Sequence, residues 1–288
     1  MLPEGLDPRL TPAREDVAAA HLKGVVEAPR YVEGEAREVA EPVAPVRRRP
    51  AGDAPLDTEA LYGERVTVYA DDGEGWAFVQ LARDGYVGYL PTDALRPPAA
   101  APTRKVAVPR TFLFPAPDIK SPPRAALCFG STVAVREEKG AFSATRDGFV
   151  FTRHLAALDT READFVEVAA RFLGVPYLWG GRSALGLDCS GLVETALSAC
   201  GIPTPRDSDM QEKALGRAVA IEAPLKRGDL LFWPGHVAIA ETPELLLHAN
   251  AFHMMVAREP LWPALARIAG TGLPLRAVRR LDATETPE

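Results

Sequence analysis

The first half of this chain contains two copies of one short sequence pattern that is typical of β-strands, and this repeat constrains how it can fold. Each copy keeps a glycine and two valines at matching places, and the parallel stretches are 61–68 with 128–135, 85–87 with 148–150, and 93–95 with 153–155. Both copies consist of short alternating segments separated by Gly, Asp and Pro, which is typical of a small β-barrel. We therefore predict two barrels, over residues 38–97 and 104–158.

The segments that flank these barrels carry weaker patterns. Residues 1–37 are rich in Pro, Glu and Ala with little periodicity, and they predict an N-terminal arm. The linker 96–102 is short and rich in proline, which favours a fixed placement of the barrels over free tethering. The basic cluster 47–49 is interpreted as a solvated strand end rather than a nucleic-acid patch.

Cys189 is the residue of the second half that points most directly to chemistry. It lies in the run Asp188-Cys189-Ser190-Gly191, at the start of a predicted helix whose apolar residues recur at helical spacing until Gly201 stops it. The helix dipole and unpaired N–H groups favour a thiolate in the first turn, so we predict a pKa below the free value of about 8.5. The alternative of a buried structural cysteine fits the apolar surroundings of Cys128 and Cys200 better.

A nucleophilic thiol needs a base, and the base needs an orienting group. Residues 228–233 predict a strand, a break follows, and His236 begins a second strand. A third strand over 244–249 carries His248, and neighbouring hairpin strands can bring the two histidines together. Ala238 and Ala240 share a face with His236, and we expect these small residues to leave room for a helix end to approach.

The other histidines fit this role less well. His21 lies in a polar stretch, His154 ends a short strand of the second barrel, and His253 is the runner-up for the orienting position but falls in a Met-rich stretch that indicates packing. A lone histidine on a strand is more often structural than catalytic. A cysteine, a histidine and a further polar group in this order predict nucleophilic catalysis.

Five motifs in the second half resemble, in order, those of the NlpC/P60 cysteine peptidases. The motifs are Tyr177-x-Trp179-Gly180-Gly181, Asp188-Cys189-Ser190-Gly191, Gly228-Asp229-Leu230, Gly235-His236-Val237-Ala238-Ile239 and Leu247-His248-Ala249. The resemblance implies a papain-like α+β catalytic domain over residues 160–288, with Cys189 as nucleophile, His236 as base and His248 as orienting group. It also implies that the Tyr177 hydroxyl lies beside the nucleophile, and that the enzyme cleaves amide bonds of peptidoglycan stem peptides.

The two predicted barrels resemble bacterial SH3 domains, so the whole chain resembles one branch of that family. Its members are cytoplasmic dipeptidyl peptidases that release L-Ala-γ-D-Glu from the diamino acid of recovered murein peptides and require a free N-terminal L-alanine. Asp207 and Ser208 match the branch's ammonium-binding pair, although Asp207 could instead cap a helix. Glu64 and Tyr86, with Tyr89 as an alternative to Tyr86, are candidates for contacts from the first SH3 domain, although Glu64 could equally be a solvated turn residue.

Further substrate-binding candidates surround the nucleophile. Asp188 and Ser190 flank Cys189 directly. Trp179 and Arg182 are expected to line the cleft, where Arg182 could meet a substrate carboxylate. An ordinary surface position for Arg182 is the competing interpretation.

The composition argues against several classes of binding partner and cofactor. The net charge of −6 and the pI near 5.5 argue against binding to a phosphate backbone, so no nucleic-acid partner is predicted. Three widely spaced cysteines do not form a disulfide framework, and the absence of Cys-x-x-Cys and His-Glu-x-x-His motifs predicts an enzyme without metal or cofactor. The first residues lack a signal peptide and no apolar run is long enough for a membrane span, so we expect a cytoplasmic location and a murein-derived peptide as partner.

Two other functions stay open at this point. One is an exported cell-wall endopeptidase of the same family, and the other is a binding module in which the SH3 domains hold a peptide and the peptidase fold is silent. An acyltransferase on the same scaffold is less favoured, because no site for a second acceptor is recognisable. The sequence assigns neither the oligomeric state nor lysine over diaminopimelate in the substrate.

Overall fold

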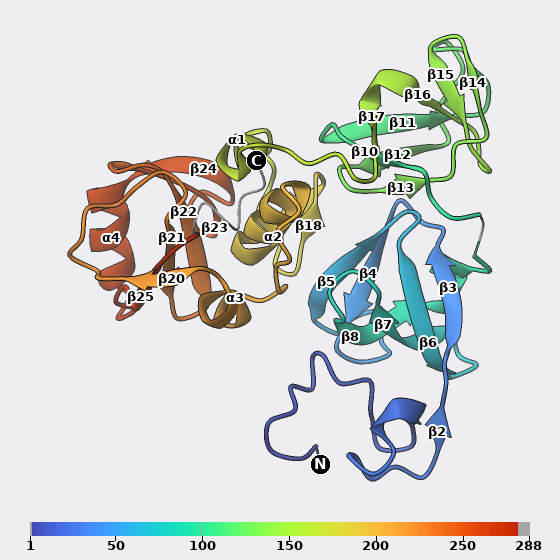
Figure 1. Cartoon of the computed structure of the whole chain (residues 1–288), viewed down its shortest axis with the longest axis horizontal. Helices are drawn as coiled ribbons and strands as arrows, with labels where there is room; N and C mark the ends of the chain where they lie inside the picture. The colour runs from blue at the N-terminus through green and yellow to red at the C-terminus, as the bar shows by residue number, and fades with distance from the viewer. Residues whose placement is uncertain (1, 99, 282–288) are drawn as a thin grey trace. The chain divides into compact units, whose positions relative to one another are not determined.

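The computed structural model describes residues 2–98 and 100–281 and divides into two compact units, Met1–Leu158 and Asp159–Glu288 (Figure 1). Ala99 of the predicted linker, Met1 of the predicted arm and residues 282–288 of the predicted catalytic domain lie outside the described residues. Within the described part, all four α-helices belong to the second unit, while the first consists of strands and short 3₁₀ turns. The predicted α+β fold, with β-barrels ahead of a mixed domain, is confirmed.

The first barrel is a seven-stranded sheet in the order β5-β4-β8-β7-β6-β3-β9. Its elements are β3 (Glu35–Val39), β4 (Val43–Arg47), β5 (Leu56–Leu61), β6 (Arg65–Asp71), β7 (Trp76–Leu81), β8 (Val87–Pro91), the 3₁₀ turn η2 (Thr92–Ala94) and β9 (Leu95–Arg96). Alternate residues such as Val66, Val79 and Leu81 point inward and are buried, which gives the barrel one continuous core.

The second barrel repeats this plan in shorter strands. Its elements are β10 (Arg104–Val106), β11 (Arg110–Phe114), β12 (Ala125–Cys128), β13 (Thr132–Val133), β14 (Glu137–Lys139), β15 (Phe142–Ala144), β16 (Phe149–Phe151), the 3₁₀ turn η3 (Thr152–His154) and β17 (Leu155–Ala157). The glycine of the repeat makes the same turn in both copies: Gly63 donates to the Val39 carbonyl and Gly130 to the Val106 carbonyl, each at 2.9 Å. Both glycines have a positive φ, +80° and +86°, which explains why the repeat keeps this residue.

The N-terminal segment is packed against the first barrel. It forms β1 (Ala18–Ala19), the 3₁₀ turn η1 (Ala20–Leu22) and β2 (Tyr31–Val32), with β1 and β2 paired in parallel. Val17 and Leu22 pack in one cluster with Phe78 of β7. The residues predicted as an arm therefore cover a face of the barrel, and the last of them, from Glu35, already belong to β3. Their irregularly spaced apolar residues gave no periodic signal for this packing.

The second unit is built around a six-stranded antiparallel sheet in the order β20-β25-β21-β22-β23-β24. Its strands are β20 (Arg217–Val219), β21 (Leu230–Trp233), β22 (His236–Thr242), β23 (Leu245–Asn250), β24 (Met255–Pro260) and β25 (Ala277–Arg280). The remaining elements are α1 (Phe165–Ala170), the hairpin of β18 (Arg182–Ser183) and β19 (Gly186–Leu187), α2 (Cys189–Ala199), α3 (Ser208–Ala214) and α4 (Leu261–Ala269). None of the helices in the described residues is long and apolar enough to cross a membrane.

Helices cover both faces of this sheet. Figure 1 shows α4 on one side of β21–β23 and α2 on the other. Ala238 and Ala240 pack in one cluster with Leu261 and Ala264 of α4. The small residues on the His236 face therefore make room for a helix, as expected, and that helix is α4. Alternation in a strand tells which residues share a face but not which helix covers it.

The repeated glycines allow a matched test of the barrel junction. A Cβ on Gly63 would collide with the carbonyl oxygen of Thr132 in the other barrel, whereas a Cβ on Gly130 would meet only Leu61 Cδ1 at 3.8 Å. Both alanine substitutions carry the same cost of a left-handed backbone, about 1–2 kcal/mol. We expect Gly63→Ala to lose roughly 1–3 kcal/mol more than Gly130→Ala in urea unfolding, because only Gly63→Ala overpacks the junction. Equal losses would contradict a close contact between the barrels.

Candidate active site

The nucleophile helix begins and ends on local signals. Asp188 is the N-cap of α2 and accepts a hydrogen bond from the backbone N–H of Gly191 at 2.7 Å. At the other end, Gly201 has φ +78°, and Ile202 N–H bonds back to the Leu197 carbonyl at 3.0 Å. Cys189 therefore lies in the first turn, as its position in the sequence predicts, with 6% of its surface exposed.

The glycines near Cys189 let a loop lie directly on the start of α2. The N–H of Asp188 donates to the Gly181 carbonyl at 3.0 Å, and the N–H of Gly180 donates to the Asp188 carboxylate at 2.8 Å. A Cβ on Gly191 would collide with the Gly181 carbonyl oxygen. The Gly-Gly and Asp-Cys-Ser-Gly motifs are thus two halves of one packed structure.

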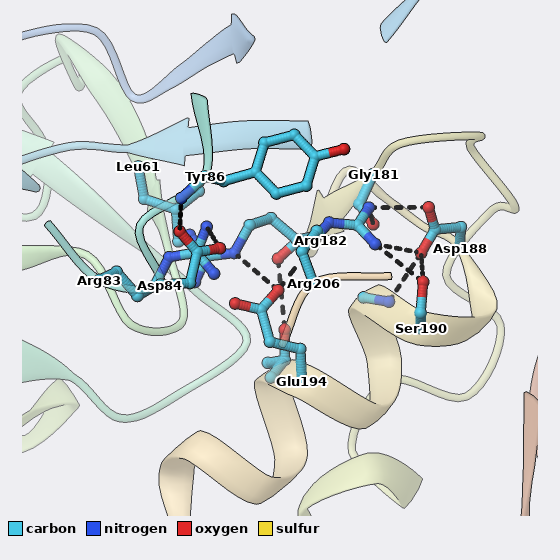
Figure 2. Close-up of polar contacts among 12 residues, drawn as sticks. Leu61, Arg83, Asp84, Tyr86, Gly181, Arg182, Asp188, Ser190, Glu194 and Arg206 are labelled. Carbon is cyan, nitrogen blue, oxygen red and sulfur yellow. Dashed lines mark hydrogen bonds and ion pairs between the residues drawn. The ribbon is translucent and has the colours of Figure 1, made fainter. Parts of the chain in front are cut away.

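Arg206 holds these two halves together (Figure 2). It binds both oxygens of the Asp188 carboxylate, at 2.7 and 3.0 Å, and it also donates to the Ser190 hydroxyl at 2.9 Å and the Gly181 carbonyl at 3.2 Å. The arginine is only 1% exposed. Sequence reasoning missed this residue, because nothing local marks a partner 18 positions away from Asp188.

In this arrangement the Asp188 and Ser190 side chains bind within the domain, and contact of these two residues with substrate stays a prediction. The Asp188 oxygens are occupied by Arg206 and by two backbone N–H groups, and the Ser190 hydroxyl is bonded to both Asp188 and Arg206. Their role is to position the helix start that carries Cys189.

Arg182 is also placed differently from the prediction. It is 6% exposed, and its Nε lies 3.7 Å from Glu194 Oε2 of α2, a residue that is itself 1% exposed (Figure 2). The antiparallel pairing of Arg182 with Leu187 places the arginine in a buried hairpin. Both the cleft-lining interpretation and the surface interpretation of Arg182 were therefore wrong, because a buried carboxylate on α2 pairs with it.

The structure brings the two predicted histidines into direct contact. His236 begins β22, His248 lies in the neighbouring β23, and His236 Nε2 is 2.9 Å from His248 Nδ1. His248 is 1% exposed, and its Nε2 lies 3.1 Å from Oε2 of Glu259, which sequence reasoning did not single out. The runner-up His253 bonds to Asn250 at 3.0 Å instead.

The thiol lies against the start of β22. The backbone N–H groups of Val237 and Ser190 donate to the Cys189 sulfur, so the nucleophile meets the strand at the residue after His236. Tyr177 is half-buried and joined to the β23–β24 turn by its N–H, which donates to the Met254 carbonyl at 2.9 Å. Burial, and then the nearby charges of Cys189 and Asp188, raise the pKa of the Tyr177 hydroxyl, which therefore stays a neutral hydrogen-bond donor.

The comparisons with known proteins agree with this geometry. Residues 174–263 match the model of the NlpC/P60 family, and residues 46–95 match the model of the bacterial dipeptidyl-peptidase SH3 domain. The second half of the chain is thus similar to the NlpC/P60 family, and part of the first half is similar to the bacterial dipeptidyl-peptidase SH3 domain.

Three relatives are similar over most of the chain. A gamma-D-glutamyl-L-lysine dipeptidyl-peptidase of Bacillus subtilis is 34% identical over 63% of this chain and 65% of its own length, and one of Bacillus cereus is 30% identical over 62% and 60%. The match thus spans less than two thirds of these curated relatives. An NlpC/P60 family protein of Bacillus cereus, solved by crystallography, has the same fold, with a TM-score of 0.72 at 22% identity over 88% of this chain and all of its own.

The pKa of Cys189 shifts in the direction opposite to the prediction. Burial, and next the charge of Asp188, raise the pKa of the Cys189 thiol to about 12, although the Val237 and Ser190 N–H groups and Arg206 act in the opposite direction. The predicted lowering was wrong because the loss of hydration outweighs the helix N-terminus. Burial likewise lowers the pKa of His236 to about 3 and of His248 to about 4. The resting site thus holds a neutral thiol beside two neutral imidazoles.

The remaining predicted residues stay predictions. Asp207 precedes α3 but makes no side-chain capping bond, so the capping alternative is not realised. Trp179 is 64% exposed, as a cleft-lining residue would be. In the first unit, Glu64 accepts from the Leu61 N–H at 3.1 Å and Tyr86 packs in the barrel core. No group of three or more metal-ligating side chains occurs among residues 2–98 and 100–281.

The buried Arg206 predicts a large stability loss when its charge is removed. Arg206→Met leaves the Asp188 carboxylate without its buried counter-charge, and we expect a loss of about 3–5 kcal/mol in urea unfolding. Arg227→Met is the matched control, because Arg227 pairs with Asp164 in the same unit with 40% of its side chain exposed. An exposed pair contributes about 0–1 kcal/mol. Similar losses for both variants would contradict the role of Arg206.

The lowered imidazole pKa values predict how the histidines titrate. In the folded protein, NMR signals of the His236 and His248 rings should not shift between pH 8 and pH 5, because both rings stay neutral there. In urea the same rings should titrate near about pH 6.5. The unfolded chain then binds more protons below that pH, so stability should fall on acidification. A midpoint near about 6.5 in the folded state would contradict burial of the neutral pair.

Proposed function

We propose that this chain is a cysteine peptidase that hydrolyses the amide bond between γ-D-glutamate and the diamino acid of murein peptides with a free N-terminal L-alanine. The observation that carries the proposal is the position of Cys189 at a helix start beside the bonded pair of His236 and His248. The substrate class is supported by the similar proteins named gamma-D-glutamyl-L-lysine dipeptidyl-peptidase.

In the proposed acylation, His236 takes the proton of Cys189 and the sulfur attacks the γ-carbonyl carbon of D-glutamate. The backbone N–H of Cys189, which has no acceptor inside α2 because it lies in the first turn, stabilises the oxyanion together with the Tyr177 hydroxyl. As the intermediate collapses, the C–N bond breaks and His236 gives its proton to the departing amine of the diamino acid.

Deacylation reverses these roles. His236 removes a proton from water, the resulting hydroxide attacks the thioester, and the C–S bond breaks to release L-Ala-γ-D-Glu and restore the thiol. Neutral side chains suit this cycle, because a base that is unprotonated at rest can accept the thiol proton without first losing one. Throughout, His248 keeps the His236 ring oriented through their 2.9 Å contact.

A free amine end is recognised, in this proposal, by Asp207 and Ser208 at the start of α3, with Trp179 beside the cleft. The Asp207 carboxylate is suited to an ammonium group because it carries the opposite charge and accepts hydrogen bonds. Glu64 and Tyr86 of the first SH3-like domain stay the candidates that the sequence predicts for further substrate contacts. A recycling enzyme of this kind would act in the cytoplasm, and cell fractionation followed by detection of the protein checks that location.

The tripeptide L-Ala-γ-D-Glu-diaminopimelate tests the proposal. We expect mass spectrometry to detect L-Ala-γ-D-Glu as product, and acetylation of the substrate amine to slow its release at least about 100-fold, because the ammonium contact is lost. Cys189→Ala should abolish turnover, whereas Cys200→Ala, which changes the other cysteine of this domain, should retain it.

Three outcomes would contradict this assignment. Equal rates for free and acetylated peptides would remove the dipeptidyl specificity, and faster release from intact peptidoglycan than from the tripeptide would favour a wall endopeptidase. Turnover by Cys189→Ala would remove the nucleophile itself.

A further inference from the structure

Two side chains extend the imidazole pair away from the sulfur. Glu259 is the penultimate residue of β24, and its Oε2 lies 3.1 Å from His248 Nε2. Arg267 of α4 binds both oxygens of that carboxylate, from Nε to Oε1 at 3.0 Å and from its terminal nitrogen to Oε2 at 2.7 Å. Glu259 is 6% exposed and the Arg267 side chain 26%, so the carboxylate is buried and the guanidinium is partly exposed.

The ionised state of Glu259 determines which atom is the donor in each hydrogen bond of this chain of contacts. Burial acts to raise the pKa of Glu259, but Arg267 and then His248 outweigh it and lower the pKa below its ordinary value. An ionised carboxylate only accepts hydrogen bonds, so the proton between it and His248 must be on the imidazole Nε2. Because a neutral imidazole has one N–H, His248 Nδ1 is then an acceptor.

The same reasoning passes to the next ring. His248 Nδ1 accepts, so His236 Nε2 must carry the proton in their 2.9 Å contact. That leaves the lone pair of His236 on Nδ1, the nitrogen that is not engaged with His248. The opposite direction would point the Nε2 lone pair of His248 at a carboxylate and would put a proton on His236 Nδ1, which could then accept none from a thiol.

We propose that Glu259, held by Arg267, is a positioning residue that sets the tautomers of both imidazoles and so makes His236 Nδ1 the base. The proposal rests on the proposed peptidase function only for its effect on rate. The tautomers themselves follow from contacts within this unit.

Arg267 is suited to hold the carboxylate still. Its guanidinium lies 4.4 Å from the centre of the Phe252 ring, so it is fixed on a second side by a cation–π contact. The helix that carries it packs on the sheet through Leu261, Ala264 and Ile268. The carboxylate that accepts from His248 is therefore held by a helix that packs on the sheet containing both histidines.

The neighbouring pair of Glu241 and Arg258 provides a matched control. It joins β22 to β24 through a forked contact of 2.6 and 2.7 Å, in the same sheet as Glu259. None of its described contacts involves a histidine. Replacing Glu241 by Gln therefore removes a carboxylate–arginine pair from this sheet. It leaves in place the proton relay, by which we mean the contacts that join His236, His248 and Glu259.

The experiment measures the ring ¹⁵N shifts of the full chain in the wild type, in Glu259→Gln and in Glu241→Gln, together with kcat and KM on the tripeptide. In the wild type and Glu241→Gln we expect Nε2–H on both rings. In Glu259→Gln we expect Nδ1–H on His236, with kcat reduced about 100-fold and KM changed less than about threefold. Arg267→Lys, which keeps the charge but not the fork, should fall between the two.

The wild-type spectrum alone can overturn the proposal, so the proposal is tested even if a variant misfolds. An Nδ1–H tautomer for His236 in the wild type, or unchanged tautomers in a folded Glu259→Gln, would overturn it. An inactive wild type with Nε2–H on both rings would instead contradict the proposed function and leave the relay standing. A similar loss of kcat in Glu241→Gln would mean that Glu259 acts only through general stability, and would also overturn the proposal.

Discussion

The bidentate contact of Arg206 with Asp188 is the interaction on which the rest of the site depends. It is buried, so neither partner can be satisfied by water, and the arginine binds the helix cap, the residue after the nucleophile and the loop carbonyl of Gly181 at once. Removing the guanidinium would leave the buried Asp188 carboxylate without a counter-charge. The direction of α2, and with it the place of the Cys189 sulfur, is therefore set by one guanidinium rather than by the helix alone.

From that fixed point, the site is assembled from opposite sides of one sheet. The sulfur belongs to α2, and the imidazoles belong to β22 and β23, on the face of the sheet that packs on α4. Burial raises the pKa of Cys189 and lowers the pKa values of His236 and His248, so all three side chains are neutral at rest. A thiol that stays protonated at rest reacts poorly with adventitious oxidants and electrophiles. Its ionisation then belongs to the reaction with a bound substrate, when the proton moves directly to His236.

The parts of this structure that the sequence predicts are those with local causes. Asp188 caps and Gly201 ends a helix through residues within a few positions, Gly63 and Gly130 mark turns through a positive φ, and a short hairpin brings His236 to His248. The parts it does not predict depend on burial or on distant partners. Arg206 and the Arg182–Glu194 pair have no local signature, and the pKa of Cys189 moved against the dipole argument because the sequence reveals a helix start but not how little water reaches it.

Strand register explains why two adjacent charged residues of β24 have different consequences. Leu247 pairs with Arg258 and Leu246 with Glu259, while His248 pairs with Ala257. Glu259 therefore lies diagonally across from His248 on the face that packs on α4, whereas Arg258 points to the opposite face and meets Glu241. A slip of one residue would exchange them and place a guanidinium, which can only donate, against the His248 ring. The direction of the proton relay is thus encoded in the pairing of two strands, well away from the cysteine that uses it.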